Sequence, residues 1–109
     1  RQIAKRYFSE IENGKISLPN CEDLSNHVFH LFVVRTENRE HLQEYLKENS
    51  IETLIHYPIP PHKQNALAQW NNLSFPITEK IHREVLSLPI SPVMSDDEVS
   101  KVIAVLNRY

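Results

Sequence analysis

The chain has 109 residues, 40% of them hydrophobic and 24% charged, with a formal net charge of −2 at pH 7. This composition is ordinary for a soluble globular protein, and the near-neutral charge gives no electrostatic reason to expect a nucleic acid or an anionic membrane as a partner. No apolar run approaches the roughly 20 residues that a transmembrane helix needs, so the length predicts one domain with a single hydrophobic core.

The first third of the chain predicts a helix followed by a strand. Residues 1–13 place four apolar side chains at helical spacing on one face: Ile3, Tyr7, Phe8 and Ile11. Gly14 is the only glycine, and it lies where a left-handed residue commonly ends a helix, so we expect it in that conformation. Residues 27–35 are apolar on both faces, which predicts a central strand with His30 largely buried.

The middle of the chain predicts a second helix and a second strand. Asn38 is a good N-cap for a helix that extends to about Asn49, which can adopt the left-handed stop. Residues 51–57 predict a strand, and a proline-rich loop follows it. Trp70, in the segment after that loop, is expected to fill part of the core because most Trp surface is buried.

The last third predicts a helix, a short strand and a final helix. Pro76 suits the first position of a helix that extends to about Leu86. Residues 86–90 predict a short or edge strand, because Pro89 interrupts it. A capping box, Ser95 with Glu98 three residues later, then opens a helix that reaches about residue 107.

The order of these elements predicts the fold class. Four helices and three strands in one short chain indicate an α+β fold. We expect a small three-stranded sheet, largely antiparallel or mixed, with about four helices packed on it.

The segment from Ile55 to Gln64 gathers most of the candidate binding side chains. Its three prolines remove backbone donors and favour a stiff, extended loop that presents side chains at low entropic cost. The polar side chains of this loop are His56, Tyr57, His62, Lys63 and Gln64. A binding surface and a plain structural corner both fit this composition.

Other kinds of site lack their sequence patterns. The six histidines show no zinc-motif spacing, and His27 and His30 would point to opposite faces of a strand, so no metal site is expected. A single glycine excludes a phosphate-cradling loop, and no serine lies in a nucleophile elbow. Cys21, the only cysteine, excludes an internal disulfide and fits a reducing compartment, so we expect a cytoplasmic location.

A set of short motifs runs in order along the whole chain. The most telling is His56-Tyr57-Pro58 with His62 and Gln64. The others are Arg1–Ala4 with Tyr7, His30–Arg35, Arg39–Leu42 with Leu46 and Ile51, Phe75-Pro76, Thr78-Glu79, Leu86–Pro92 and Met94-Ser95. Together they resemble the C-terminal small domain of the DegT/DnrJ/StrS family of pyridoxal phosphate (PLP) sugar aminotransferases. The resemblance implies the fold of the small domain in fold-type I aminotransferases.

The resemblance implies that residues 1–109 form one domain of a longer aminotransferase whose large PLP-binding domain is absent. The start at Arg1, inside a helical pattern and without Met, fits a piece of a longer protein. The whole enzyme would move an amino group from an amino acid, typically glutamate, to a nucleotide-linked keto sugar. It would be a homodimer in which the small domain covers the cleft.

The same resemblance places the candidate substrate-binding residues. His56 and Tyr57 are expected to approach the sugar or its diphosphate, with His62 and Gln64 nearer the rim. The alternative for His56 and Tyr57 is that they only brace the loop, since buried polar groups usually find structural partners.

The chain departs from the family pattern at two places and lacks the lysine that binds PLP. Ser50 stands where glycine is usual, which costs little if Asn49 takes the left-handed turn. Thr53-Leu54 lacks the small residue often seen before His-Tyr-Pro, which would narrow a pocket there. The lysine that family members join to PLP lies in the large domain, and no motif of that kind exists here.

These observations lead to an expectation and an alternative. We expect the isolated chain neither to bind PLP well nor to transaminate. The alternative function is a free-standing binding or oligomerisation module derived from the same family.

Overall fold

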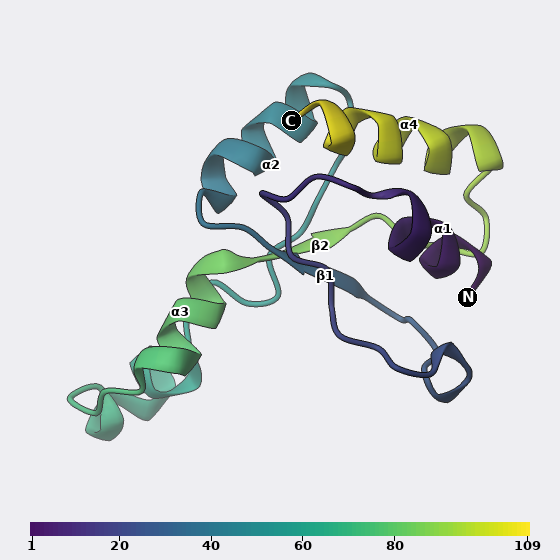
Figure 1. The fold of residues 1–109 in the computed structure, drawn as a ribbon. Coiled ribbons are helices and arrows are strands. Elements are labelled where there is room, and N and C mark those ends of the chain that lie inside the picture. Colours follow the sequence, from purple (N-terminus) through teal and green to yellow (C-terminus); the bar gives the residue numbers. More distant parts are fainter.

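The computed structural model describes all residues, 1–109, and has an α+β fold. Figure 1 shows its four α-helices and two strands in chain order. Their bounds are α1 Gln2–Glu10, β1 Phe32–Arg35, α2 Arg39–Glu48, α3 Pro76–Glu84, β2 Val85–Leu88 and α4 Asp96–Arg108. Three short 3-10 helices add to these: η1 Leu24–Asn26, η2 Pro61–Lys63 and η3 Asn65–Trp70.

The sheet contains two antiparallel strands, so the prediction of three strands is wrong. β1 pairs with β2, with Phe32 opposite Leu88, and the expected third strand over residues 51–57 is reduced to one bridge between Leu54 and Ser87. Only Leu54 of this segment exchanges backbone hydrogen bonds with the sheet, and the prolines at 58, 60 and 61, which have no backbone N–H, keep the ladder from extending beyond Tyr57.

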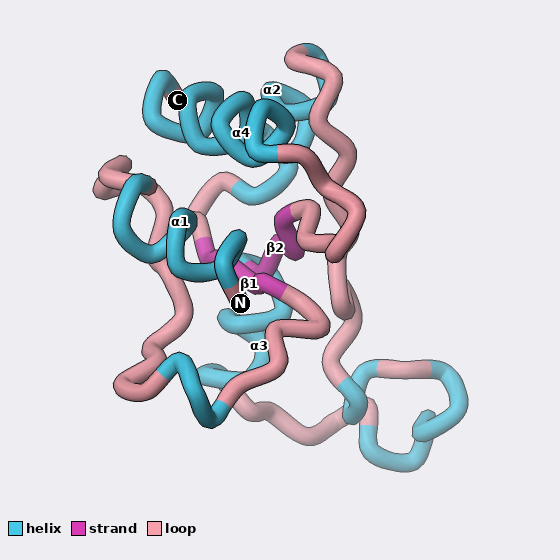
Figure 2. Tube along the Cα trace, turned by 90° about the vertical axis from the view of Figure 1, so that its right-hand side faces the viewer, coloured by secondary structure: helices cyan, strands magenta, loops and turns pink.

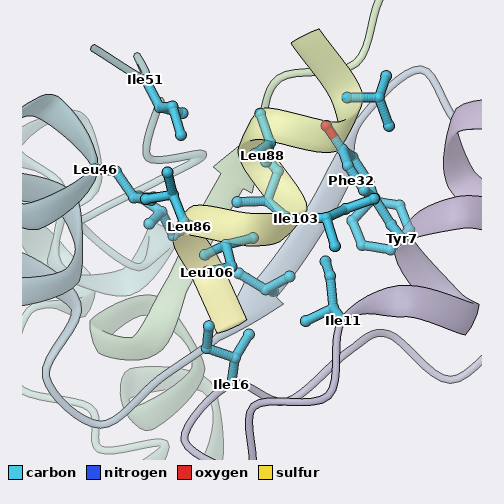
Figure 3. Packing of buried hydrophobic residues seen from close by; sticks show 14 of the residues in the cluster. Tyr7, Ile11, Ile16, Phe32, Leu46, Ile51, Leu86, Leu88, Ile103 and Leu106 are labelled. Carbon is cyan, nitrogen blue, oxygen red and sulfur yellow. The ribbon is translucent and has the colours of Figure 1, made fainter. Parts of the chain in front are cut away.

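One apolar cluster joins the sheet to three of the helices. Phe32, Val34, Leu86 and Leu88 share one face of the sheet and belong to a cluster of 17 buried residues that also draws on α1, α2 and α4. Figure 3 shows Ile103 and Leu106 of α4 beside these strand residues, with Tyr7 of α1 next to Phe32. The Tyr45 hydroxyl on α2 donates to the carbonyl of Val105, 2.8 Å away, so α2 and α4 lie side by side.

The ends of two helices differ from the sequence-based expectation. No glycine has a positive φ, so Gly14 is not a left-handed stop; α1 ends at Glu10, and the next residue, Ile11, is extended. At the end of α2 the left-handed residue is Ser50 (φ 62°), whereas Asn49 has φ −95°. The capping box of α4 is confirmed, because Ser95 Oγ accepts from the N–H of Glu98 at 3.2 Å and Glu98 Oε2 accepts from the N–H of Ser95 at 3.0 Å.

The first strand is shorter than its apolar pattern predicts. Phe29 has φ 52°, which turns the chain and confines β1 to four residues. Its ring then packs edge-to-face on Phe8, with the ring centroids 5.9 Å apart. His30, on the far side of this turn, is exposed rather than buried.

Residues 57–84 form a projection that we call the arm, and the remaining residues form the body. The arm contains η2, η3 and α3, which extend away from α1, α2 and α4 in Figure 1, and η2 and η3 also lie apart from them in the rotated view of Figure 2. None of the 17 cluster residues belongs to the arm. Trp70, expected in the core, is half-exposed there.

Candidate functional site

A groove lies along the edge of the body where the arm begins. It has a volume of about 1100 Å³ and is bounded by α2, α4, the end of β2 and the segment before the arm. His56 is part of the lining of this groove. Charged side chains of both signs also line it: Glu44, Lys47, Glu52, Glu98 and Lys101. Because the charges are mixed, the groove as a whole does not select for one sign of ligand.

His56 is held in place at this groove by contacts from two sides. Its Nδ1 lies 2.8 Å from the hydroxyl of Ser87 in β2, and the Tyr57 ring packs edge-to-face against it with centroids 5.3 Å apart. The bridge between Leu54 and Ser87 fixes the backbone two residues earlier, with hydrogen bonds of 2.8 and 3.3 Å. His56 is therefore part-buried and oriented by the sheet itself.

Tyr57 follows through a cis peptide bond and begins the arm. Its ring is mostly exposed, and its hydroxyl has no hydrogen-bond partner in the chain. Its carbonyl oxygen lies 2.5 Å from Nδ1 of His82 in α3, which ties the two ends of the arm together. The phenol of Tyr57 is thus accessible to a ligand, while its backbone carbonyl holds the start of the arm to α3.

His62 and Gln64 lie within the arm and make structural contacts. His62 is buried, with its ring edge-to-face on Phe75 at 4.8 Å and its Nε2 3.7 Å from Glu79 Oε2, too far for a hydrogen bond. Gln64 is exposed, and its side-chain amide donates to the carbonyl of Ile59 at 3.3 Å. The buried position of His62 differs from the rim position that the resemblance implied.

The four residues predicted from sequence do not gather in one pocket. His56 lies at the groove, Tyr57 at the root of the arm, and the other two farther along it. Sequence reasoning missed Ser87, because a serine inside a short apolar strand gives no signal until the neighbouring segment is known. It also missed that the arm exposes six large apolar side chains: Tyr57, Ile59, Trp70, Leu73, Phe75 and Ile77.

The residues of this chain do not fit PLP. Covalent attachment of PLP needs a lysine whose amine is desolvated or lowered in pKa by its surroundings. Every lysine here is exposed, including Lys47 and Lys101 at the groove. A phosphate-cradling loop is missing too, since the only glycine stands in open space at residue 14.

The chain has neither a cluster of metal ligands nor a helix suited to a membrane. No three His, Cys, Asp or Glu side chains lie close enough together to hold a metal ion. Among the helices, none combines the length and the apolar character that a membrane crossing demands.

Comparison with known sequences gives matches along the whole chain. The profile of the DegT/DnrJ/EryC1/StrS aminotransferase family matches residues 1–107. A dTDP-3-amino-3,6-dideoxy-alpha-D-galactopyranose transaminase from Aneurinibacillus thermoaerophilus is 58% identical over 109 residues, which are 100% of this chain and 30% of that protein. A dTDP-3-amino-3,4,6-trideoxy-alpha-D-glucose transaminase from Streptomyces venezuelae is 38% identical over 98% of this chain and 29% of its own length.

Comparison with solved structures agrees. DesV of S. venezuelae, solved with a ketimine intermediate, superposes with a TM-score of 0.90 at 36% identity, over 98% of this chain and 30% of that one. NtdA of Bacillus subtilis, solved with bound cofactor PMP, gives a TM-score of 0.85 at 31% identity, over 98% of this chain and 26% of that one. The chain thus spans about 30% of the length of the relatives that it matches.

Proposed function

Since the chain belongs to the DegT/DnrJ/EryC1/StrS aminotransferase family, we propose that it is the C-terminal small domain of a PLP-dependent sugar aminotransferase. The whole enzyme transfers an amino group from an amino acid, glutamate in our proposal, to a keto sugar linked to a nucleotide. The observation that carries this proposal is the match to sugar transaminases from end to end of the chain, over only about 30% of their length.

In this proposal the chemistry resides outside these residues. PLP supplies an electron sink that the side chains of a protein cannot replace. Because no lysine here is sheltered, the cofactor must be held by the remaining part of the enzyme. The isolated chain is therefore inactive in our proposal, and its contribution is to bind and cover.

The lid role rests on the arm. Six large apolar side chains of the arm are exposed, and a projecting segment with this many of them suits a surface that another part of the protein covers. We assign the large domain and a second subunit of a homodimer as the surfaces that the arm closes against. His56 and Tyr57, at the junction of arm and body, would then meet the sugar or its diphosphate, with His62 and Gln64 supporting the arm behind them.

A steady-state experiment on the full-length enzyme, expressed from the native gene, tests these roles. His56→Ala and Tyr57→Phe should raise the KM for the sugar nucleotide about tenfold, the effect of losing roughly 1.4 kcal/mol of binding. The half-reaction with glutamate should keep its rate, because the donor does not need these groups. His41→Ala, an exposed histidine that contacts Tyr109 instead of the groove, is the matched control.

Two results would count against the proposal. If both variants keep the wild-type KM, His56 and Tyr57 only brace the loop. If the 109-residue chain alone gains the absorbance band of lysine-bound PLP, the cofactor is not confined to the large domain.

The free-standing module remains the second candidate, favoured by the chain's own closed apolar cluster. The native gene separates the two. A lysine-bearing large domain encoded before Arg1 decides for the enzyme, and a natural start close to Arg1 decides for the module.

A further inference from the structure

The contact between His56 and Ser87 decides which nitrogen of the imidazole carries the proton. Ser87 is 5% exposed, and its only side-chain hydrogen bond is the 2.8 Å contact to His56 Nδ1. If Nδ1 carried the proton and donated, the nearly buried Ser87 O–H would have no acceptor left within the chain. Buried donors without a partner are rare and costly, so the hydroxyl donates to Nδ1.

This direction leaves the proton of neutral His56 on Nε2. A neutral imidazole has one N–H and one acceptor nitrogen, and here the acceptor is engaged by Ser87. Nε2 has no partner in the chain, yet it is not among the buried unpartnered atoms, so solvent reaches it. His56 therefore offers a hydrogen-bond donor, and not a base, at the groove.

We propose that Ser87 is a positioning residue, which holds His56 as an Nε2–H donor for an oxygen atom of the substrate. This inference rests on the proposed function and adds to it a residue and a direction for the hydrogen bond. The oxygen acceptor can be a sugar hydroxyl or a phosphate oxygen of the nucleotide, which accept the same donor.

The position of Ser87 makes its side chain testable without breaking the sheet. Its N–H and C=O both bond to Leu54 through the backbone, so Ser87→Ala removes only the hydroxyl. Ser87→Cys keeps a weak donor in nearly the same volume and serves as the conservative variant. Amide NMR spectra of both variants, compared with wild type, report whether the fold is kept.

The first readout is long-range proton–nitrogen NMR of His56 in the 109-residue chain, at a pH where imidazole is neutral. We expect an unprotonated, hydrogen-bonded Nδ1 and a protonated Nε2 in the wild type. Ser87→Ala should move the Nδ1 signal towards that of an unbonded nitrogen, and Ser87→Cys should move it less. A protonated Nδ1 in the wild type would overturn the inference, whatever the enzyme does.

The second readout is a double-mutant cycle in the full-length enzyme. Ser87→Ala should raise the KM for the sugar nucleotide about threefold to tenfold and spare the glutamate half-reaction, with partial rescue by Ser87→Cys. Adding Ser87→Ala to His56→Ala should cause no further loss, because the hydroxyl acts through the imidazole. Additive losses, or an unchanged KM in active Ser87→Ala enzyme, would contradict the inference.

Inhibition by the nucleoside diphosphate alone distinguishes the two kinds of oxygen. If Ser87→Ala weakens this inhibition as much as it raises the KM, the acceptor is a phosphate oxygen. If inhibition is unchanged, the acceptor is a sugar hydroxyl. An enzyme that aminates no nucleotide-linked keto sugar would refute the proposed function, whereas the NMR result would still decide the state of His56.

Discussion

The body buries one continuous apolar cluster, whereas the arm is held together by single polar contacts. In the body, 17 residues from α1, α2, α4, the sheet and the segments that connect them pack together. In the arm, Asn71 makes most of these contacts: its side-chain Nδ2 lies 2.8–3.3 Å from the backbone carbonyls of His62, Gln64 and Leu67. The backbone carbonyl of Asn71 accepts from Lys63 Nζ at 2.7 Å.

This difference teaches where stability and where contact surface reside. Apolar burial contributes most of the folding free energy, so the body should decide whether the chain folds. The arm has few buried apolar contacts, and such segments open locally at lower free energy than the core. The following substitutions test this division, beginning with the largest expected effect.

Removing a core side chain should cost far more than removing an arm side chain of similar size. Leu106→Ala, in the fully buried part of α4, should lower the free energy of unfolding by about 2–5 kcal/mol. Ile77→Ala, at a position 78% exposed on α3, should change it by less than about 0.5 kcal/mol. Urea denaturation measures both, and equal losses would show that the arm shares the body's cooperative core.

Alkaline pH should expose a second difference, between Tyr7 in the body and Tyr57 in the arm. Burial raises the pKa of Tyr7 above its ordinary value, and its hydroxyl donates to the carbonyl of Pro89 at 2.6 Å. Because the unfolded chain releases this proton near pH 10 and the folded chain retains it, the contribution of Tyr7 to stability is constant below that pH and falls above it, by up to about 1.4 kcal/mol per pH unit.

The measurement is the free energy of unfolding between pH 8 and about pH 11, near and above the phenol pKa. Tyr7→Phe should flatten the alkaline decline, at the expense of the hydrogen bond to Pro89. Tyr57→Phe is the matched control and should keep the wild-type slope, since its ring is mostly exposed. Identical slopes in wild type and Tyr7→Phe would contradict the assignment.

Breaking one polar contact in each region should have different consequences. Ser95→Ala removes the N-cap of α4 and should lower the free energy of unfolding by about 1 kcal/mol. Asn71→Ala should barely change the global value but should speed proteolysis within the arm, because it frees three carbonyls there. A global loss from Asn71→Ala as large as that from Ser95→Ala would mean that the arm is not a separate unit.

One substitution in the body should stabilise the chain slightly. Ser50 has a left-handed conformation that glycine adopts more easily, so Ser50→Gly should raise the free energy of unfolding by about 0.5 kcal/mol. Ser9→Gly, inside α1, should lower it instead, because glycine is a poor helix former. Thermal melts of the two variants should therefore shift in opposite directions.

The helices and the approximate places of both strands could be predicted from local patterns, but the lengths of the strands and the loss of the third strand could not. The cap at Ser95 and the proline at position 76 act within one turn of helix, so sequence alone located the starts of α4 and α3. The apolar residues from 27 to 35 predicted a longer strand, whereas the chain turns at Phe29, whose N–H donates to His27 Nδ1 and whose ring contacts Phe8, far away in sequence. The apolar pattern reports neither contact, so it overestimated the length of the strand.

The candidate site was predictable in composition but not in arrangement. The resemblance drew attention to His56, yet nothing in the sequence indicated that β2 would supply a buried hydroxyl to its Nδ1. The same limit applies to Trp70: its type favours burial, whereas its position in a projecting segment leaves it half-exposed. The exposure of a residue in the arm depends on how the whole chain is arranged. The spacing of neighbouring residues in the sequence does not predict it.

The bridge between Leu54 and Ser87 has a consequence for the length of the segment that it closes. The polypeptide departs from the sheet and re-enters it at hydrogen-bonded neighbours, about thirty residues apart in sequence. Closing a loop between two fixed points depends only weakly on loop length. Changes in the length of the intervening segment can therefore leave strand register and core packing intact, so that the structure of the body does not depend on how long the arm is.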